Sequence, residues 1–142
     1  MPDGMTNASP LRGIRVCMAT SGHSADDDRI FHKEARTLAK AGADVVVLCA
    51  RGAKPPARPD GVRFATYEGG GRLKDRAFTV GALEQAIVDR RCDVVHAHEP
   101  DSLVAALRAK RRAGGKVIFD SHELWAGVAA VRFPRPLWPM AM

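Results

Sequence analysis

The chain has 142 residues, a length that suits one domain built around a single hydrophobic core. Its hydrophobic fraction of 46% and charged fraction of 27% are ordinary for a globular protein, and no apolar run approaches the length of a membrane span. The net charge of +6 allows an anionic partner such as a nucleotide or a phospholipid surface, and it fits equally well a solvated surface rich in arginine.

Short apolar runs, rich in β-branched residues, alternate with segments of helical periodicity. The helical segments begin near Arg29, Leu73 and Pro100, the first of them preceded by acidic residues at positions where helix caps are favoured. The apolar runs predict five strands, at 14–20, 44–50, 62–67, 93–98 and 116–121. This order predicts an α/β fold with a doubly wound, parallel, Rossmann-like sheet, in which the first strand is central and the direction reverses beside the fourth.

The helical periodicity also predicts which side chains face the core. The set comprises Phe78, Ala82, Leu83, Ala86 and Ile87 in the second helix, and Leu103, Ala106 and Leu107 in the third.

Three segments outside this pattern complete the predicted organisation. Residues 1–13 have no apolar signal-peptide core and predict a flexible leader before a Rossmann-like domain at 14–125. Residues 126–142 form an apolar tail with three prolines and no further strand. We therefore expect the last strand to be an exposed apolar edge and the domain to be truncated.

The three cysteines predict a reducing compartment, and hence a cytoplasmic protein. None has the CxxC spacing of a metal or redox site, and Cys17 and Cys49 lie inside apolar runs, where buried, inert thiols are expected.

Polar residues gather after three of the predicted strands. In an open parallel sheet, ligands bind outside the carboxyl ends of the strands, so these residues are expected to line one crevice. The candidates are Gly22, His23, Asp28 and Arg29 after the first strand, His96, His98 and Glu99 at the fourth, and Asp120, His122 and Glu123 after the fifth.

Simpler interpretations exist for the first of these groups. The acidic run at 26–28 is typical of helix capping, and the absence of GxGxxG and GxxxxGK[ST] motifs disfavours a dinucleotide or P-loop site. The stretch SGHS before a helix could still hold an anion. The basic stretches lack interleaved aromatic residues, so nucleic acid is not an expected partner.

The histidine pair raises the question of a metal. His96 and His98 point to the same face of a strand, and Asp120 or His122 could supply a third zinc ligand. No diagnostic spacing supports that set, so the favoured interpretation is that His96 packs or hydrogen-bonds while His98 frames a polar pocket. We predict no metal site.

His122 could transfer a proton or bind a hydroxyl or phosphate oxygen, unless the backbone satisfies it as an ordinary loop histidine.

Three spaced segments between Arg15 and Trp125 resemble the N-terminal domain of family 4 glycosyltransferases, which are retaining enzymes of the GT-B architecture. The matching residues are Asp28, Arg29, Glu34 and Ala35; then Asp93, His96, His98, Glu99 and Leu103; then Asp120, His122 and Glu123.

The resemblance implies two Rossmann-like domains facing each other across a cleft. The N-terminal domain mainly binds the acceptor, and the C-terminal domain holds most of the nucleotide-sugar. It implies a catalytic contact from His122 to the transferring sugar or its phosphate. The candidate substrate-binding residues are Gly22, His23, Asp28, Arg29, His98, Glu99, Asp120 and Glu123. No tightly bound cofactor or metal is implied, and a UDP- or GDP-sugar would be the co-substrate.

One departure from the family pattern limits what this chain is expected to do. No E-x7-E element follows Trp125, so the donor-binding domain must come from the same or a separate chain, and we expect these residues alone not to turn over. The loop after the first strand also lacks the paired glycines of many relatives.

The acceptor could be a lipid, a polysaccharide or a small molecule, and the positive charge is compatible with the inner face of a membrane.

Two other functions remain open at this level. One is a non-catalytic α/β module for binding or subunit pairing, which the apolar tail favours. The other is a metal-dependent hydrolase using His96, His98 and Asp120.

Overall fold

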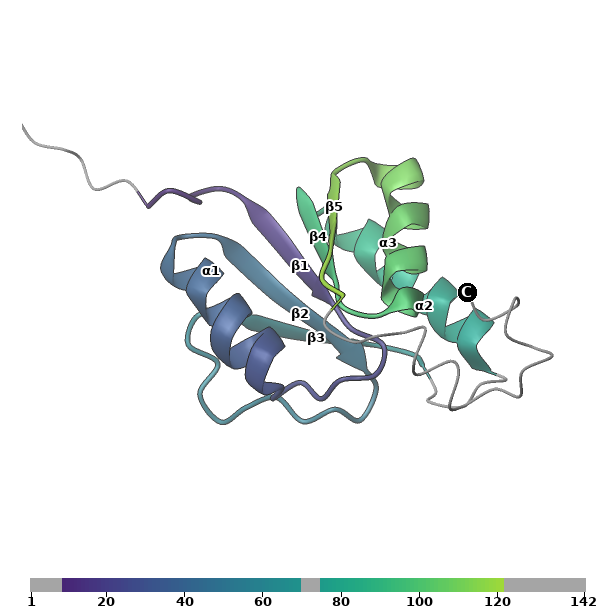
Figure 1. Ribbon diagram of the computed structural model, residues 1–142, viewed down its shortest axis with the longest axis horizontal. Coiled ribbons are helices and arrows are strands. Elements are labelled where there is room, and N and C mark those ends of the chain that lie inside the picture. Colours follow the sequence, from purple (N-terminus) through teal and green to yellow (C-terminus); the bar gives the residue numbers. More distant parts are fainter. Residues whose placement is uncertain (1–8, 70–74, 122–142) are drawn as a thin grey trace, which may run out of the picture.

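A computed structural model describes residues 9–69 and 75–121, which form a five-stranded parallel sheet with helices on both faces (Figure 1). The strand order is β3-β2-β1-β4-β5. The strands are β1 (Arg15–Ala19), β2 (Asp44–Ala50), β3 (Arg63–Tyr67), β4 (Val94–Ala97) and β5 (Lys116–Phe119). This order confirms the predicted doubly wound α/β fold and the central place of the first strand. The order could be predicted because parallel strands joined by right-handed crossovers admit few alternatives.

The helical segments lie in two layers. The π-helical segment η1 (Asp28–Ala35) continues into α1 (Arg36–Lys40) on one face, while α2 (Arg76–Arg90) and α3 (Pro100–Ala113) pack together on the other (Figure 1). Strand β1 shows the consequence for its side chains: Val16 and Met18 are buried with η1, whereas Cys17 and Ala19 are buried beneath α2 and α3. Burial on both faces explains why the strands read as continuous apolar runs.

The start of η1 is set by Asp27, whose Oδ1 accepts hydrogen bonds from the backbone N–H groups of Arg29 (2.9 Å) and Ile30 (2.8 Å). This confirms helix capping for Asp27. Just past the end of α1, Gly42 takes a φ of +95°, a conformation that costs glycine little and that commonly ends helices.

Two predicted core residues are exposed instead. Phe78 in α2 is 63% exposed and Leu107 in α3 is 42% exposed. The inward face of α3 consists of small residues, including Ser102 and Ala106, because α3 packs closely against α2. Helical spacing fits more than one apolar stripe, and the contact between the two helices selected a different stripe from the predicted one.

Strand β5 ends at Phe119, two residues earlier than predicted, and its apolar side chains are open. Ile118 is 51% exposed and Phe119 is 37% exposed, which agrees with the expected apolar edge. Among the described helices, none combines the length and apolar composition that crossing a bilayer requires.

Candidate functional site

The loop after β1 is organised around the carboxylate of Glu99. Glu99 Oε1 accepts hydrogen bonds from Thr20 Oγ1 (2.6 Å) and the Gly22 backbone N–H (3.2 Å), and Oε2 accepts from the Ser21 N–H (2.9 Å). The Nδ1 atom of His23 contacts the same carboxylate. The structure therefore brings together Gly22, His23 and Glu99, three of the predicted site residues.

Glu99 is held in turn by the helix that follows it. Ser102 Oγ lies 3.0 Å from Glu99 Oε2 and accepts a hydrogen bond of 2.9 Å from the Glu99 backbone N–H, which forms a capping box at the start of α3. Pro100 occupies the first turn of α3, as predicted, where a missing N–H costs nothing.

The environment of Glu99 decides its charge. Burial by itself disfavours the carboxylate, but the hydrogen bonds from Thr20, Ser21 and His23 outweigh it and lower the pKa of Glu99. Only 5% of Glu99 is exposed, so its carboxylate supports the loop from below and presents little surface to a ligand.

Tyr67 reaches the same loop from β3, donating a hydrogen bond of 2.8 Å from its hydroxyl to the Thr20 backbone oxygen. We expect Tyr67→Phe to lower the free energy of unfolding by about 1 kcal/mol, because a buried acceptor loses its donor. Urea unfolding monitored by circular dichroism measures this change. Thr66→Val removes an exposed hydroxyl from the same strand and is expected to stay within about 0.5 kcal/mol of the wild type. Equal losses in both variants would contradict the assigned role.

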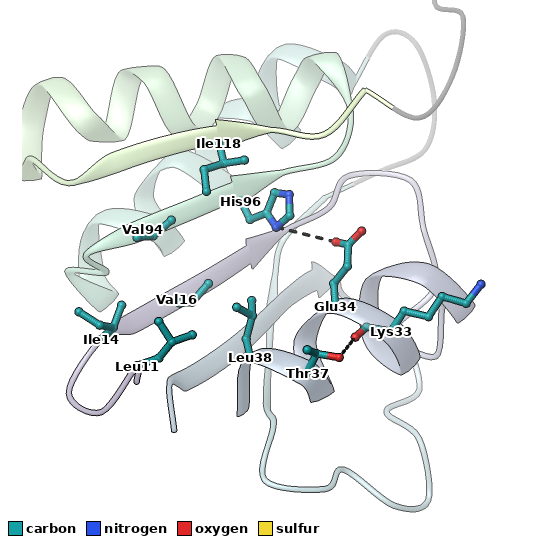
Figure 2. A pocket seen from close by; sticks show the side chains of 10 residues that line it. All are labelled: Leu11, Ile14, Val16, Lys33, Glu34, Thr37, Leu38, Val94, His96 and Ile118. Atoms are coloured by element: carbon teal, nitrogen blue, oxygen red, sulfur yellow. Dashed lines mark hydrogen bonds and ion pairs between the residues drawn. The ribbon is translucent and has the colours of Figure 1, made fainter. Parts of the chain in front are cut away.

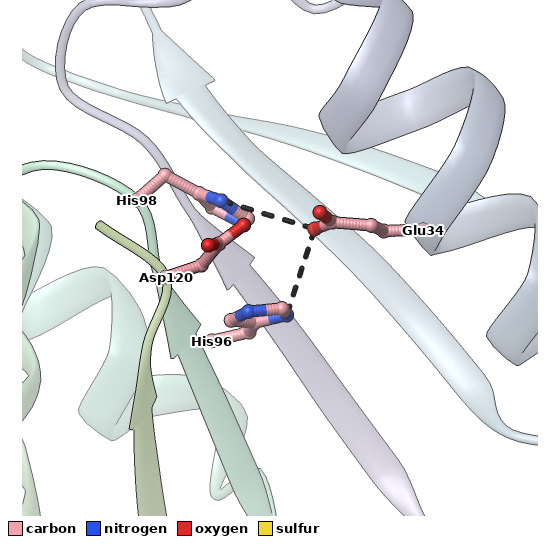
Figure 3. A group of neighbouring side chains, drawn as sticks. All are labelled: Glu34, His96, His98 and Asp120. Atoms are coloured by element: carbon pink, nitrogen blue, oxygen red, sulfur yellow. Dashed lines mark ion pairs between the residues drawn. The ribbon is translucent and has the colours of Figure 1, made fainter. Parts of the chain in front are cut away.

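A second group of polar side chains lies at the carboxyl ends of β4 and β5 (Figure 3). Glu34 comes from η1, His96 and His98 from β4 and the residue after it, and Asp120 from the end of β5. The Asp120 backbone N–H donates to the Ala97 oxygen at 2.9 Å, which sets the end of β5 beside that of β4. One ligand-capable atom from each of the four residues lies within 4.8 Å of the others.

Arg29 binds both carboxylates of this group. Its Nη2 donates to Asp120 Oδ2 (2.8 Å) and its Nε donates to Glu34 Oε1 (3.1 Å). The other carboxylate oxygen, Glu34 Oε2, lies 3.8 Å from His96 Nδ1 and 3.9 Å from His98 Nδ1. Arg29 and Asp120 are both predicted site residues. Arg29 links Asp120 to Glu34, a glutamate that the site prediction did not include.

Burial shifts the ionisation of two members of this group. It raises the pKa of Glu34, an effect that Arg29 only partly offsets, and it lowers the pKa of His96. Burial therefore favours the neutral form of the His96 imidazole. The side chain of His98 is fully buried, and its ring centroid lies 4.5 Å from that of His96.

Other candidates fall outside these two groups. The Asp28 side chain is 87% exposed and pairs with Lys33 at 3.4 Å on the helix surface. His122 and Glu123 lie outside the described residues.

Glu34 belonged to a recognised motif, whereas no sequence signal identified Thr20, Tyr67 or Ser102, because their partners are distant in the sequence or depend on loop conformation.

An apolar pocket of about 490 Å³ adjoins the second group on the η1 face of the sheet (Figure 2). Glu34 and His96 form its polar end, and the side chains of Val94 and Ile118 form part of its wall. The remaining lining residues are Leu11, Ile14, Val16, Lys33, Thr37 and Leu38. A volume of this size is typical of sites for small organic ligands.

Comparison with known sequences places most of the chain in a family. Residues 28–141 match the sequence model of the family described as Glycosyltransferase Family 4. A search of curated proteins found no match. The matched region includes Glu34, His96, His98 and Asp120, so it covers the entire second group, together with Arg29.

Proposed function

The chain belongs to Glycosyltransferase Family 4, and from this premise we propose that it is the acceptor-side domain of a retaining GT-B enzyme. The enzyme would transfer a sugar from a nucleotide-sugar to a hydroxyl acceptor. The observation that carries the proposal is the family match over residues 28–141, together with the convergence of its polar residues at the carboxyl edge of the sheet.

The two polar groups suggest separate roles. We assign Gly22 and His23, on the loop held by Glu99, to the side that meets the donor, because an imidazole suits phosphate oxygens. We assign Arg29 and Asp120 to the acceptor, and we assign His98, whose side chain is fully buried, to the support of this group. Glu99 acts through the loop, while direct contacts from Asp28, His122 and Glu123 remain part of the proposal.

The leaving diphosphate needs preorganised positive charge. Within the described residues, the Arg29 guanidinium beside the second group is already engaged by Asp120 and Glu34. We therefore assign most of the donor binding to a C-terminal domain in the same or a separate chain, with a UDP- or GDP-sugar as co-substrate and no tightly bound cofactor. The enzyme would work in the cytoplasm, where its net charge of +6 is compatible with the inner face of a membrane.

The pocket supports one class of acceptor over another. Its wall is apolar and its polar end is formed by Glu34 and His96, which suits an acceptor that carries a hydroxyl on an apolar body. A lipid or an apolar small molecule fits this description better than a polysaccharide does.

A calorimetric titration of the 142-residue chain tests the division of roles. UDP-glucose and GDP-mannose are expected to give no saturable heat, because the donor contacts lie elsewhere. Saturable binding of either sugar-nucleotide to this chain would overturn the acceptor-side assignment.

Saturation-transfer NMR with octyl glucoside and glucose tests the acceptor class. We expect a clear signal for octyl glucoside only, with a loss of at least fivefold in Ile118→Asp, which places a charge in the pocket wall. Arg112→Ala serves as the control, because Arg112 pairs with Glu84 away from the pocket. Equal signals for both ligands, or no effect of Ile118→Asp, would count against an apolar acceptor.

A further inference from the structure

We propose that Glu34, His96, His98 and Asp120 bind a divalent transition-metal ion, with Zn²⁺ as the best fit. The sequence disfavoured a metal because the histidine pair lacked a ligand at a recognisable spacing. The fold supplies that ligand from η1, where Glu34 points toward both imidazoles (Figure 3). This inference does not depend on the glycosyltransferase assignment.

The distances suit a site that closes on an ion. Zinc–nitrogen and zinc–oxygen bonds of about 2.0–2.2 Å place neighbouring tetrahedral ligands roughly 3.3–3.5 Å apart. The separations of 3.8 and 3.9 Å between Glu34 Oε2 and the two Nδ1 atoms exceed this by about half an ångström, a gap that side-chain rotation can close. The fourth residue, Asp120, has an oxygen within the same 4.8 Å group.

The donor set favours one kind of metal. Two imidazole nitrogens with carboxylate oxygens match zinc and its transition-metal neighbours, whereas Mg²⁺ and Ca²⁺ prefer oxygen ligands throughout. The side chains of Glu34, His96 and Asp120 are 22%, 16% and 21% exposed, so an ion can reach the group from solvent.

Glu34 gives an independent reason to expect a cation. Its Oε2 atom is buried and accepts no hydrogen bond from any residue of the described ranges. Buried carboxylate oxygens are normally satisfied, and an exception calls for an ion or another explanation. Arg29 orients Glu34 through the opposite oxygen, Oε1, which leaves Oε2 directed at the histidines.

Arg29 also limits the affinity. Its guanidinium occupies both oxygens of Asp120, at 2.9 and 2.8 Å, and brings a positive charge close to the ion. Zinc must therefore compete with Arg29 for Asp120. Removing the guanidinium frees a carboxylate and lowers the electrostatic cost, so Arg29→Met should bind zinc about tenfold more tightly.

The test is a ZnCl₂ titration of the full chain, tag-free and stripped of metal, in competition with a chromophoric chelator. We expect one equivalent in the wild type, at least tenfold weaker binding in His96→Ala and Glu34→Gln, and tighter binding in Arg29→Met. His32→Ala is the matched control and should change nothing, because His32 pairs with Asp26 on the helix surface. Far-UV circular dichroism confirms that each variant is folded.

Two outcomes overturn the proposal. One is the absence of stoichiometric binding in the folded wild-type chain. The other is binding that survives both Glu34→Gln and His96→Ala, which would show adventitious zinc on surface histidines. A zinc-induced shift of the imidazole nitrogens in ¹⁵N NMR, lost in Glu34→Gln, adds support that does not depend on the folding of His96→Ala.

Discussion

Glu99→Ala is expected to lower the free energy of unfolding by about 3 kcal/mol, the largest effect of any single change at the site. The substitution removes the acceptor for the Thr20 hydroxyl and for the backbone N–H groups of Ser21 and Gly22. Each buried donor left without a partner costs about 1–3 kcal/mol, and the two backbone groups recover part of that cost by binding water. The loop that carries His23 should lose its ordered conformation.

Chemical denaturation and amide hydrogen exchange measure these two effects. Glu99→Gln keeps the shape and one acceptor oxygen, so it should cost roughly 1–2 kcal/mol. Glu68→Ala is the matched control, because Glu68 is exposed and pairs with Arg51 at the surface, where such a pair contributes about 1 kcal/mol or less. If Glu99→Ala and Glu68→Ala unfold at the same urea concentration, the carboxylate does not organise the loop.

The link between Glu99 and the loop connects stability to function. Glu99 begins α3, directly follows His98 and holds the loop of Gly22 and His23. Glu99 therefore organises the loop and lies next in sequence to a residue of the second group. Loss of ligand binding in Glu99→Ala, with the second group unchanged in His96 and His98 chemical shifts, would trace the defect to the loop.

Leu83→Ala is expected to cost about 2–5 kcal/mol, because Leu83 in α2 is fully buried and the substitution leaves a cavity. Phe78→Ala removes a larger side chain from the same helix. It should cost about 0.5 kcal/mol or less, since Phe78 is 63% exposed. The pair separates the contribution of burial from that of side-chain size.

Urea unfolding of both variants measures this contrast. An m-value equal to that of the wild type will show that the compactness of the two end states is unchanged. A loss in Phe78→Ala as large as that in Leu83→Ala would mean that Phe78 is buried in solution, as the sequence periodicity indicated.

The strands and their order were predictable because one physical condition governs both. Strands buried on two faces must be apolar throughout, as in the run Asp44–Ala50, and their parallel connections must be right-handed. The carboxyl-edge position of the polar residues followed directly, since it is a property of parallel sheets. The helix cap at Asp27 was equally local and therefore readable from sequence.

Tertiary packing, and no local sequence pattern, decided which helix faces are buried and which polar residues pair. Phe78 and Leu107 fit a helical stripe, but the close packing of α2 against small residues of α3 left them outside the core. Glu34 appeared in a family motif without a role, and Tyr67 and Ser102 carried no signal. Each of these roles depends on which segment lies across from the residue, and no local pattern records that neighbour.

The sequence by itself thus determined the parallel α/β fold, the edge at which its polar residues gather and the resemblance to a glycosyltransferase family. Backbone hydrogen bonding, apolar periodicity and crossover handedness are local or general constraints, and they act on any chain with this pattern. Only the tertiary structure divided the polar residues into a loop held by Glu99 and a cluster around Glu34. Contacts between residues far apart in the chain arise from packing, because the free energy of each side chain depends on the neighbours that the fold brings to it.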